Sequence, residues 1–125
     1  MTQDIYAAEA KERWGDTDAY KESQRRMVGY SKEDIAKAQQ AMQVATNLVL
    51  NAMKAGLPSD SPAAMAGAEA HRQSISDYWY ECSYEIHTGL ATMYLADPRF
   101  MAHYEGQQAG LAKYIHVAIV ANANK

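Results

Sequence analysis

The sequence has one cysteine, one phenylalanine and three prolines in 125 residues. A single cysteine cannot form an internal disulfide, which agrees with a reducing compartment. No apolar run approaches the roughly 18 residues of a membrane-spanning helix, and the first residues lack the basic start and apolar stretch of a secretion signal. We therefore expect a soluble protein of the cytoplasm.

An excess of positive charge is also absent. The formal net charge is -3, so the chain offers no electrostatic attraction for the phosphates of nucleic acid, and we do not expect it to bind DNA directly. The sequence also lacks a HExxH motif, a Glu-x-x-His pair, a glycine-rich phosphate loop and a GxSxG motif. We expect no enzyme activity, no catalytic residues, no cofactor and no metal site.

Strand signals are missing too, since apolar residues do not alternate with a period of two and β-branched clusters are few. Apolar residues recur instead at helical spacing, which predicts an all-α fold in a single domain. Ser31 with Asp34, and Ser61 followed by Pro62, are typical of helix starts. The expected helices cover residues 31–55, 61–95, 97–106 and 109–121.

Tyrosine and methionine are abundant, with nine and seven residues. Amphipathic rings and flexible thioethers suit a surface that contacts varied ligands, although a tyrosine-rich core explains the same composition. The long helix expected over residues 61–95 would carry a stripe of mixed chemistry, which we interpret as a wall of a binding site. The stripe consists of His71, Ile75, Tyr78, Cys82, Glu85, Gly89 and Met93. His87 is expected on the opposite face, so it should not share a metal ion with His71.

Residues 1–30 differ from the rest because they are dense in charge and have few bulky side chains, among them Trp14 and Tyr20. A helix of this composition is marginal in isolation. It could order only when these rings pack on a ligand, which would make the segment a lid. A permanently docked N-terminal helix is the alternative, and the residues leave both open.

Several segments together resemble the TipAS antibiotic-recognition domain, the C-terminal effector part of MerR-family transcription activators that sense thiopeptide antibiotics. These segments are EAKERWGDTDAYKESQRR (9–26), HRQ (71–73), YECSYEIHT (80–88), MYLADPRF (93–100) and GLAKY (110–114). The resemblance implies a globin-like, all-α fold with a broad ligand cleft. It also implies an N-terminal lid over residues 1–30 that orders around ligand, and an antibiotic-binding core over residues 31–125.

The sequence departs from this family at Gly89. In a thiopeptide binder of this kind, a cysteine after the His-Thr pair captures a dehydroalanine of the antibiotic as a thioether, and Gly89 occupies that position here. Cys82 corresponds to a second cysteine, but its expected neighbours Tyr78 and Glu85 include no cation that would favour a thiolate. We therefore expect non-covalent binding. Gly89 either deepens the pocket or permits close helix packing.

Two functions are consistent with these observations. The first is binding of a bulky, largely apolar, thiopeptide-like antibiotic, either to sequester the drug or to sense it for a DNA-binding domain fused in a longer product. Stacking and apolar contacts are assigned to Trp14, Tyr20, Tyr78 and Met93, and polar anchoring to His71 and Glu85. The alternative is a protein-interaction module whose aromatic cleft accepts a partner helix.

Overall fold

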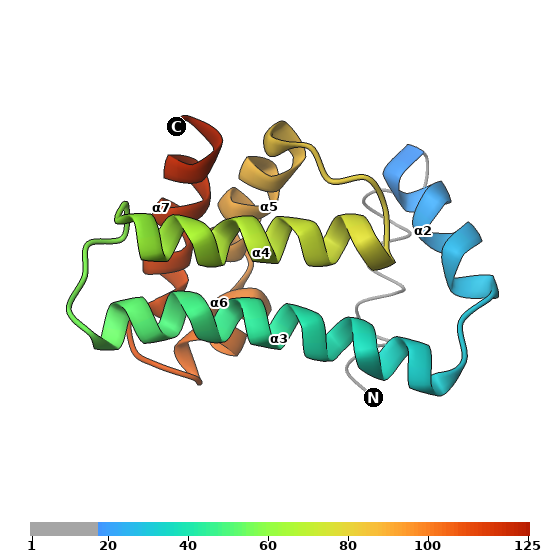
Figure 1. The fold of residues 1–125 in the computed structure, drawn as a ribbon, viewed down its shortest axis with the longest axis horizontal. Helices are drawn as coiled ribbons and strands as arrows, with labels where there is room; N and C mark the ends of the chain where they lie inside the picture. Colours follow the sequence, from blue (N-terminus) through green and yellow to red (C-terminus); the bar gives the residue numbers. More distant parts are fainter. Residues whose placement is uncertain (1–17) are drawn as a thin grey trace.

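A computed structural model of the chain describes residues 18–125, with side chains from residue 21 onward (Figure 1). The helices are α2 (Asp18–Val28), α3 (Lys32–Lys54), α4 (Pro62–Tyr78), α5 (Tyr84–Ala96), α6 (Pro98–Glu105) and α7 (Leu111–Ala123). No strand occurs in this part of the chain. The prediction of an all-α fold is confirmed.

The helix starts predicted from local sequence are present. At the start of α3, the Ser31 amide donates to Asp34 Oδ2 at 3.0 Å and the Asp34 amide donates to Ser31 Oγ at 3.2 Å, which is a complete capping box. Ser61 Oγ accepts from the Ala64 amide at 3.3 Å at the start of α4, with Pro62 in the first turn. These caps satisfy amides that have no partner inside the helix.

The long helices α3 and α4 run antiparallel, side by side, and α5, α6 and α7 pack behind them (Figure 1). Gly67 makes the close approach of α3 and α4 possible. A Cβ atom at this position would lie 2.7 Å from Val49 Cγ2 and 2.8 Å from the Val49 backbone nitrogen. Only a residue without a side chain fits here.

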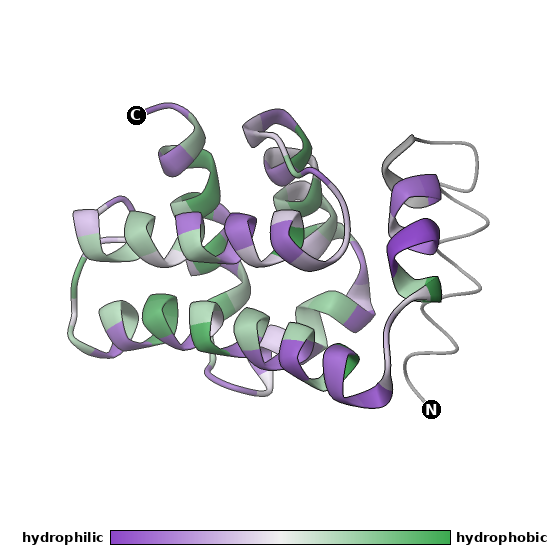
Figure 2. Ribbon diagram, turned by 45° about the vertical axis from the view of Figure 1, so that its right-hand side comes forward, coloured by the Kyte–Doolittle hydropathy of each residue, from purple (hydrophilic) through white to green (hydrophobic). Residues whose placement is uncertain are grey.

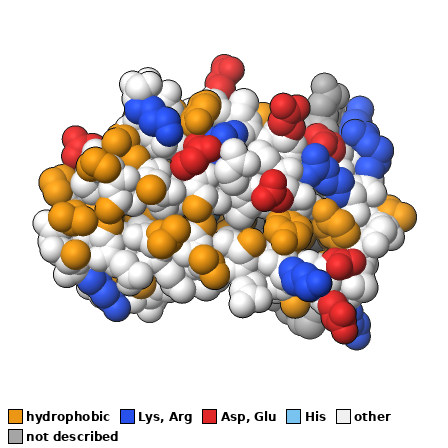
Figure 3. Space-filling model, viewed as in Figure 1, with side chains coloured by type: hydrophobic (Ala, Val, Ile, Leu, Met, Phe, Trp, Pro, Cys, Tyr) orange, Lys and Arg blue, Asp and Glu red, His pale blue; other side chains and the backbone are white. Residues whose placement is uncertain are grey.

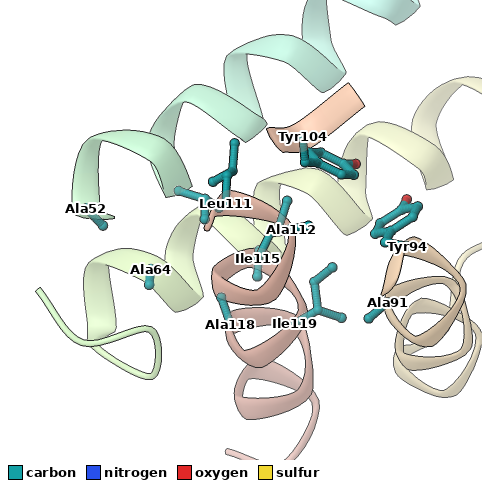
Figure 4. Packing of buried hydrophobic residues seen from close by; sticks show 12 residues of the cluster. Ala52, Ala64, Ala91, Tyr94, Tyr104, Leu111, Ala112, Ile115, Ala118 and Ile119 are labelled. Carbon is teal, nitrogen blue, oxygen red and sulfur yellow. The ribbon is translucent and has the colours of Figure 1, made fainter. Parts of the chain in front are cut away.

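Helix α7 forms the centre of the core. It contacts α3, α4, α5 and α6, and Figure 4 shows its apolar side chains pointing toward these helices. Leu111, Ile115 and Ile119 are fully buried and meet mainly alanines and tyrosines of the surrounding helices. Figure 2 shows the contrast between α7, which is largely apolar, and α2, which is largely hydrophilic and lies at one end of the molecule. Helix α7 therefore supplies the three largest fully buried side chains of the described residues.

The face formed by α3 and α4 keeps some apolar surface in contact with solvent. Figure 3 shows hydrophobic side chains spread across this face, and the large exposed ones on α3 are Val44 and Leu48. They lie one helical turn apart.

The prediction of one helix from residue 61 to residue 95 is wrong. The chain leaves the helix after Tyr78, and α5 begins after a loop and crosses behind α4 instead of extending it (Figure 1). Side chains compete for the backbone here, because the Cys82 amide donates to Ser76 Oγ at 2.9 Å. Ser83 then caps α5 by accepting from the Ile86 amide at 3.1 Å.

Candidate functional site

The break between α4 and α5 divides the predicted stripe, so its seven residues do not share one helix face. His71, Ile75 and Tyr78 belong to α4, Cys82 lies in the loop, and Glu85, Gly89 and Met93 belong to α5. His71, Ile75 and Cys82 are buried, Tyr78 and Met93 are half-buried, and Glu85 and Gly89 are exposed. Of the seven, only the half-buried and exposed residues can contact a ligand in this structure, namely Tyr78, Met93, Glu85 and Gly89.

His71 and His87 form a buried pair, which the sequence reasoning placed on opposite faces. His71 Nδ1 lies 3.0 Å from His87 Nε2, and the two rings stack with centroids 5.2 Å apart. Both side chains are fully buried. The prediction of opposite faces is wrong because it assumed an unbroken helix, whereas the loop lets α5 fold back and bring His87 beside α4. Full burial keeps His71 from the surface in this structure, so its predicted role as a polar anchor for a ligand stays a prediction.

Two tyrosines extend this pair into a polar network inside the apolar core. The Tyr104 hydroxyl lies 3.5 Å from His71 Nε2, and the rings of Tyr94 and Tyr104 pack together with centroids 5.1 Å apart (Figure 4 shows both tyrosines). His87 Nδ1 is buried and has no partner among the described residues. A buried nitrogen without a hydrogen-bond partner lowers the stability of the folded state, so His87 Nδ1 is a destabilising feature of this network.

Burial keeps every member of this network uncharged. It lowers the pKa of His71 to about 4 and that of His87 to about 3, the latter also through repulsion from His71 and Arg72. It raises the pKa of Tyr104 to about 12 and that of Tyr94 well above its ordinary value. The sequence reasoning did not select Tyr104, whose only signal was an aromatic residue near the end of a short helix.

A polar clamp on the other side of α4 holds the loop. Glu69 accepts from Arg72 Nε and Nη2 at 3.1 and 2.6 Å and from Asn122 Nδ2 at 3.0 Å. Arg72 Nη1 donates to the Cys82 carbonyl at 2.7 Å, and its guanidinium carbon lies 4.3 Å from the centre of the Tyr84 ring. The bonds from Arg72 hold the pKa of Glu69 well below its usual range. The clamp thereby joins α4, the loop, α5 and α7.

Cys82 is a poor nucleophile in this setting. Its side chain is fully buried, and burial raises the pKa of the thiol to about 11, while the nearby Arg72 charge offsets the increase only in part. The sequence reasoning placed Cys82 on the same helix face as Gly89, and that placement is wrong because Cys82 lies in the loop. At ordinary pH the thiolate is therefore almost absent.

Gly89 lies at an open position of α5. It is exposed, and a Cβ atom built on it meets no heavy atom within 4 Å in the described part of the chain. Close helix packing therefore does not explain this glycine, which removes a side chain from the surface.

The sequence match that identifies the chain covers nearly all of it. Residues 6–122 match the family described as the TipAS antibiotic-recognition domain. The chain belongs to the TipAS family. The HTH-type transcriptional activator TipA of Streptomyces coelicolor is 44% identical over 120 residues, which are 96% of this chain and 47% of that protein. The activator mta of Bacillus subtilis is 30% identical over 94% of this chain and 45% of that protein. This TipAS chain thus spans about half the length of these relatives.

Solved structures show the same fold. A TipAS structure from Streptomyces lividans in complex with nosiheptide, from a thiopeptide antibiotic multidrug resistance system, has a TM-score of 0.88 and 44% identity, covering 97% of this chain and 85% of that chain. The antibiotic-binding domain of a TipA-class multidrug resistance transcriptional regulator has a TM-score of 0.64 and 42% identity, covering 70% of this chain and 93% of that chain. The globin-like helical fold is confirmed. Family membership favours antibiotic recognition over a cleft for a partner helix.

The remaining sequence predictions concern the N-terminal segment, membranes and metals. Trp14 lies outside the described residues, and so does the side chain of Tyr20. Among the described helices, none is long and apolar enough to cross a membrane. Within residues 18–125, no three metal-binding side chains of histidine, cysteine, aspartate or glutamate gather at one point. The residues that contact a ligand therefore stay predictions.

Proposed function

We propose that this TipAS domain binds bulky, largely apolar antibiotics of the thiopeptide class without forming a covalent bond. The observation that carries the proposal is the match, with a TM-score of 0.88 over 97% of the chain, to a relative solved with nosiheptide. Relatives twice as long are transcription activators, which supports a role as the ligand-sensing domain of such a protein. Drug sequestration by the domain alone uses the same binding step.

The ligand contacts we propose are the accessible members of the predicted set. Tyr78 and Met93 offer apolar and aromatic surface, Glu85 offers a carboxylate, and Gly89 leaves room. Trp14 and Tyr20 are proposed to pack over the ligand from the N-terminal side. The buried members of the predicted set lie beneath this surface and support it; they are His71, Ile75 and Cys82.

Non-covalent binding follows from the two positions that could supply a thiol. Gly89 carries no side chain, and Cys82 combines full burial with a pKa of about 11. We also infer that the domain has no catalytic role, because the family that it matches is described as an antibiotic-recognition domain and its sequence contains none of the catalytic motifs named above. A cytoplasmic location is inferred from the activity of the relatives as transcription activators.

The test is a titration with nosiheptide, in which calorimetry measures binding and mass spectrometry of the intact protein in the mixture detects any covalent adduct. We expect saturable binding with an unchanged protein mass. Gly89→Cys is the matched variant, because the open space accepts the side chain and the thiol can add across a dehydroalanine double bond with no leaving group. Added ligand mass in the variant alone supports the proposal, whereas added mass in the natural protein would contradict non-covalent binding. Absence of binding in both would refute antibiotic recognition.

A further inference from the structure

The first turn of α5 carries a proposed ligand contact, Glu85, but buries none of its own side chains. Tyr84 and Ile86 are 38% and 37% exposed, Glu85 is exposed as well, and the first buried residue of the helix is His87. Helix ends in proteins are held mainly by tertiary packing, and a turn with few buried apolar contacts opens easily. The position of Glu85 therefore depends on polar contacts that hold this turn.

Some of these contacts belong to the loop that joins α4 to α5 (Figure 1). Ser83 caps α5 by accepting from the Ile86 amide, which stabilises the turn itself but does not attach it to a neighbouring helix. The Cys82 amide donates to Ser76 Oγ at 2.9 Å, which attaches the loop to α4. Arg72 adds the contacts that reach α5.

Arg72 of α4 contacts the residue before Ser83 and the residue after it. Its Nη1 donates to the Cys82 carbonyl at 2.7 Å, and its guanidinium carbon lies 4.3 Å from the centre of the Tyr84 ring. The Arg72 side chain is only 14% exposed, so solvent and salt screen these contacts weakly. Arg72 thus holds the start of α5 on both sides of its cap.

Glu69 fixes the orientation of the Arg72 guanidinium. One carboxylate oxygen accepts from Arg72 Nε at 3.1 Å and the other from Nη2 at 2.6 Å, a paired arrangement that sets the plane of the guanidinium as well as its position. Asn122 of α7 donates to the same carboxylate at 3.0 Å. A continuous set of contacts therefore runs from α7 through Glu69 and Arg72 to the first turn of α5.

We propose that Arg72 is a positioning residue of the ligand site, which fixes the first turn of α5 and thereby the positions of Glu85 and Gly89 relative to a bound antibiotic. This inference rests on the proposed function, which places both residues against the ligand. Arg72 acts through the turn and not by touching the ligand. A displacement of about 1 Å at such a site is enough to slow a reaction between protein and ligand by about a hundredfold.

Amide hydrogen exchange in the ligand-free protein tests the attachment. Arg72→Gln should speed exchange of the Ile86 and His87 amides about tenfold, the factor expected from one hydrogen bond to a charged group. Arg26→Gln is the matched control, because Arg26 also pairs with a glutamate and donates to a backbone carbonyl at the break, that of Ser76 at 2.6 Å. The control should leave both amides unchanged. Unchanged exchange in Arg72→Gln, or equal acceleration in Arg26→Gln, would overturn the proposal.

Tyr84→Leu tests the same role in a protein that keeps the pair of Arg72 and Glu69. The substitution removes the ring on which the guanidinium lies and leaves an apolar side chain at an exposed position. We expect exchange of the Ile86 amide to rise about threefold, the factor of one partly exposed cation–π contact. A rate equal to that of the natural protein would overturn the part assigned to the ring.

The rate of thioether formation in the Gly89→Cys protein tests the role in the ligand site. The Cys sulfur bonds to the β-carbon of a dehydroalanine, the carbon–carbon double bond becomes single, and the thiol proton is replaced by one on the α-carbon. With saturating nosiheptide all of the protein is folded and bound, so reduced stability or affinity alone leaves the first-order rate constant unchanged. A changed rate constant therefore reports the placement of residue 89.

We expect Arg72→Gln in the Gly89→Cys protein to lower this rate constant at least tenfold. Arg99→Gln, which breaks an ion pair with Asp97 beyond the other end of α5, should leave it unchanged. Equal rate constants with and without Arg72 would overturn the positioning role. If nosiheptide fails to bind the natural protein, the proposed function fails, and exchange in the ligand-free protein still decides whether Arg72 holds the turn.

Discussion

The buried pair of His71 and His87 makes the stability of the domain depend on pH in a range where carboxylates remain ionised. Burial lowers both folded-state pKa values below the ordinary value of 6.5, to about 4 and about 3. Below pH 6.5 these two histidines therefore bind protons in the unfolded chain but stay unprotonated in the folded chain. Stability should be complete above pH 6.5 and should fall as the pH drops toward the folded-state values.

The expected size follows from the linkage relation. Each histidine contributes a slope of about 1.4 kcal/mol per pH unit below 6.5, so each should cost about 1.4 kcal/mol at pH 5.5. The pair should then lower the free energy of unfolding by about 3 kcal/mol between pH 7.5 and pH 5.5. This loss is a large share of the roughly 5–15 kcal/mol that stabilises a typical domain.

Urea unfolding followed by far-ultraviolet circular dichroism at several pH values measures this loss. His87→Gln removes one titrating group, so its free energy of unfolding should fall by only about half as much over the same interval, whatever its absolute stability. The slope is the readout, because the substitution also changes packing. A natural protein whose stability is flat from pH 7.5 to 5.5, or a variant with an unchanged slope, would refute the assignment of a neutral buried pair.

Three further predictions follow from single positions. Gly67→Ala should destabilise the domain by about 1–3 kcal/mol, because the new Cβ atom would lie 2.8 Å from the Val49 backbone nitrogen, and urea unfolding measures it. Gly89→Ala is the matched control in open helix and should stabilise by up to about 1 kcal/mol; equal effects at both glycines would contradict the packing argument. Ser83→Ala should cost about 1 kcal/mol through loss of the α5 cap, and thermal unfolding with no change in midpoint would show that the cap is dispensable. Iodoacetamide at pH 8 should leave Cys82 unmodified in the folded protein and alkylate it in urea, since a pKa of about 11 leaves about a thousandth of the thiol ionised; rapid alkylation of the folded protein would show an accessible thiol.

The sequence by itself determined the all-α class, the family and several helix starts. Ser31 with Asp34, and Ser61 with Pro62, act on amides within three residues, so their effect is readable from neighbouring letters. The departure at Gly89 was also visible directly. These features depend on local chemistry or on a pattern spread along the chain, and neither needs the packed structure.

Only the tertiary structure decided where the central helix ends and which residues the break brings into contact. Residues 61–95 have no proline or glycine near residue 80 to announce a break, and the competing bonds come from side chains such as Ser76 and Arg72 together with docking by α2. The break brings His87 to His71 and gives Arg26 its acceptor, contacts between residues 16 and 50 positions apart. Helical periodicity cannot encode such contacts, because it assumes that the backbone continues and gives each side chain a direction on that assumption alone.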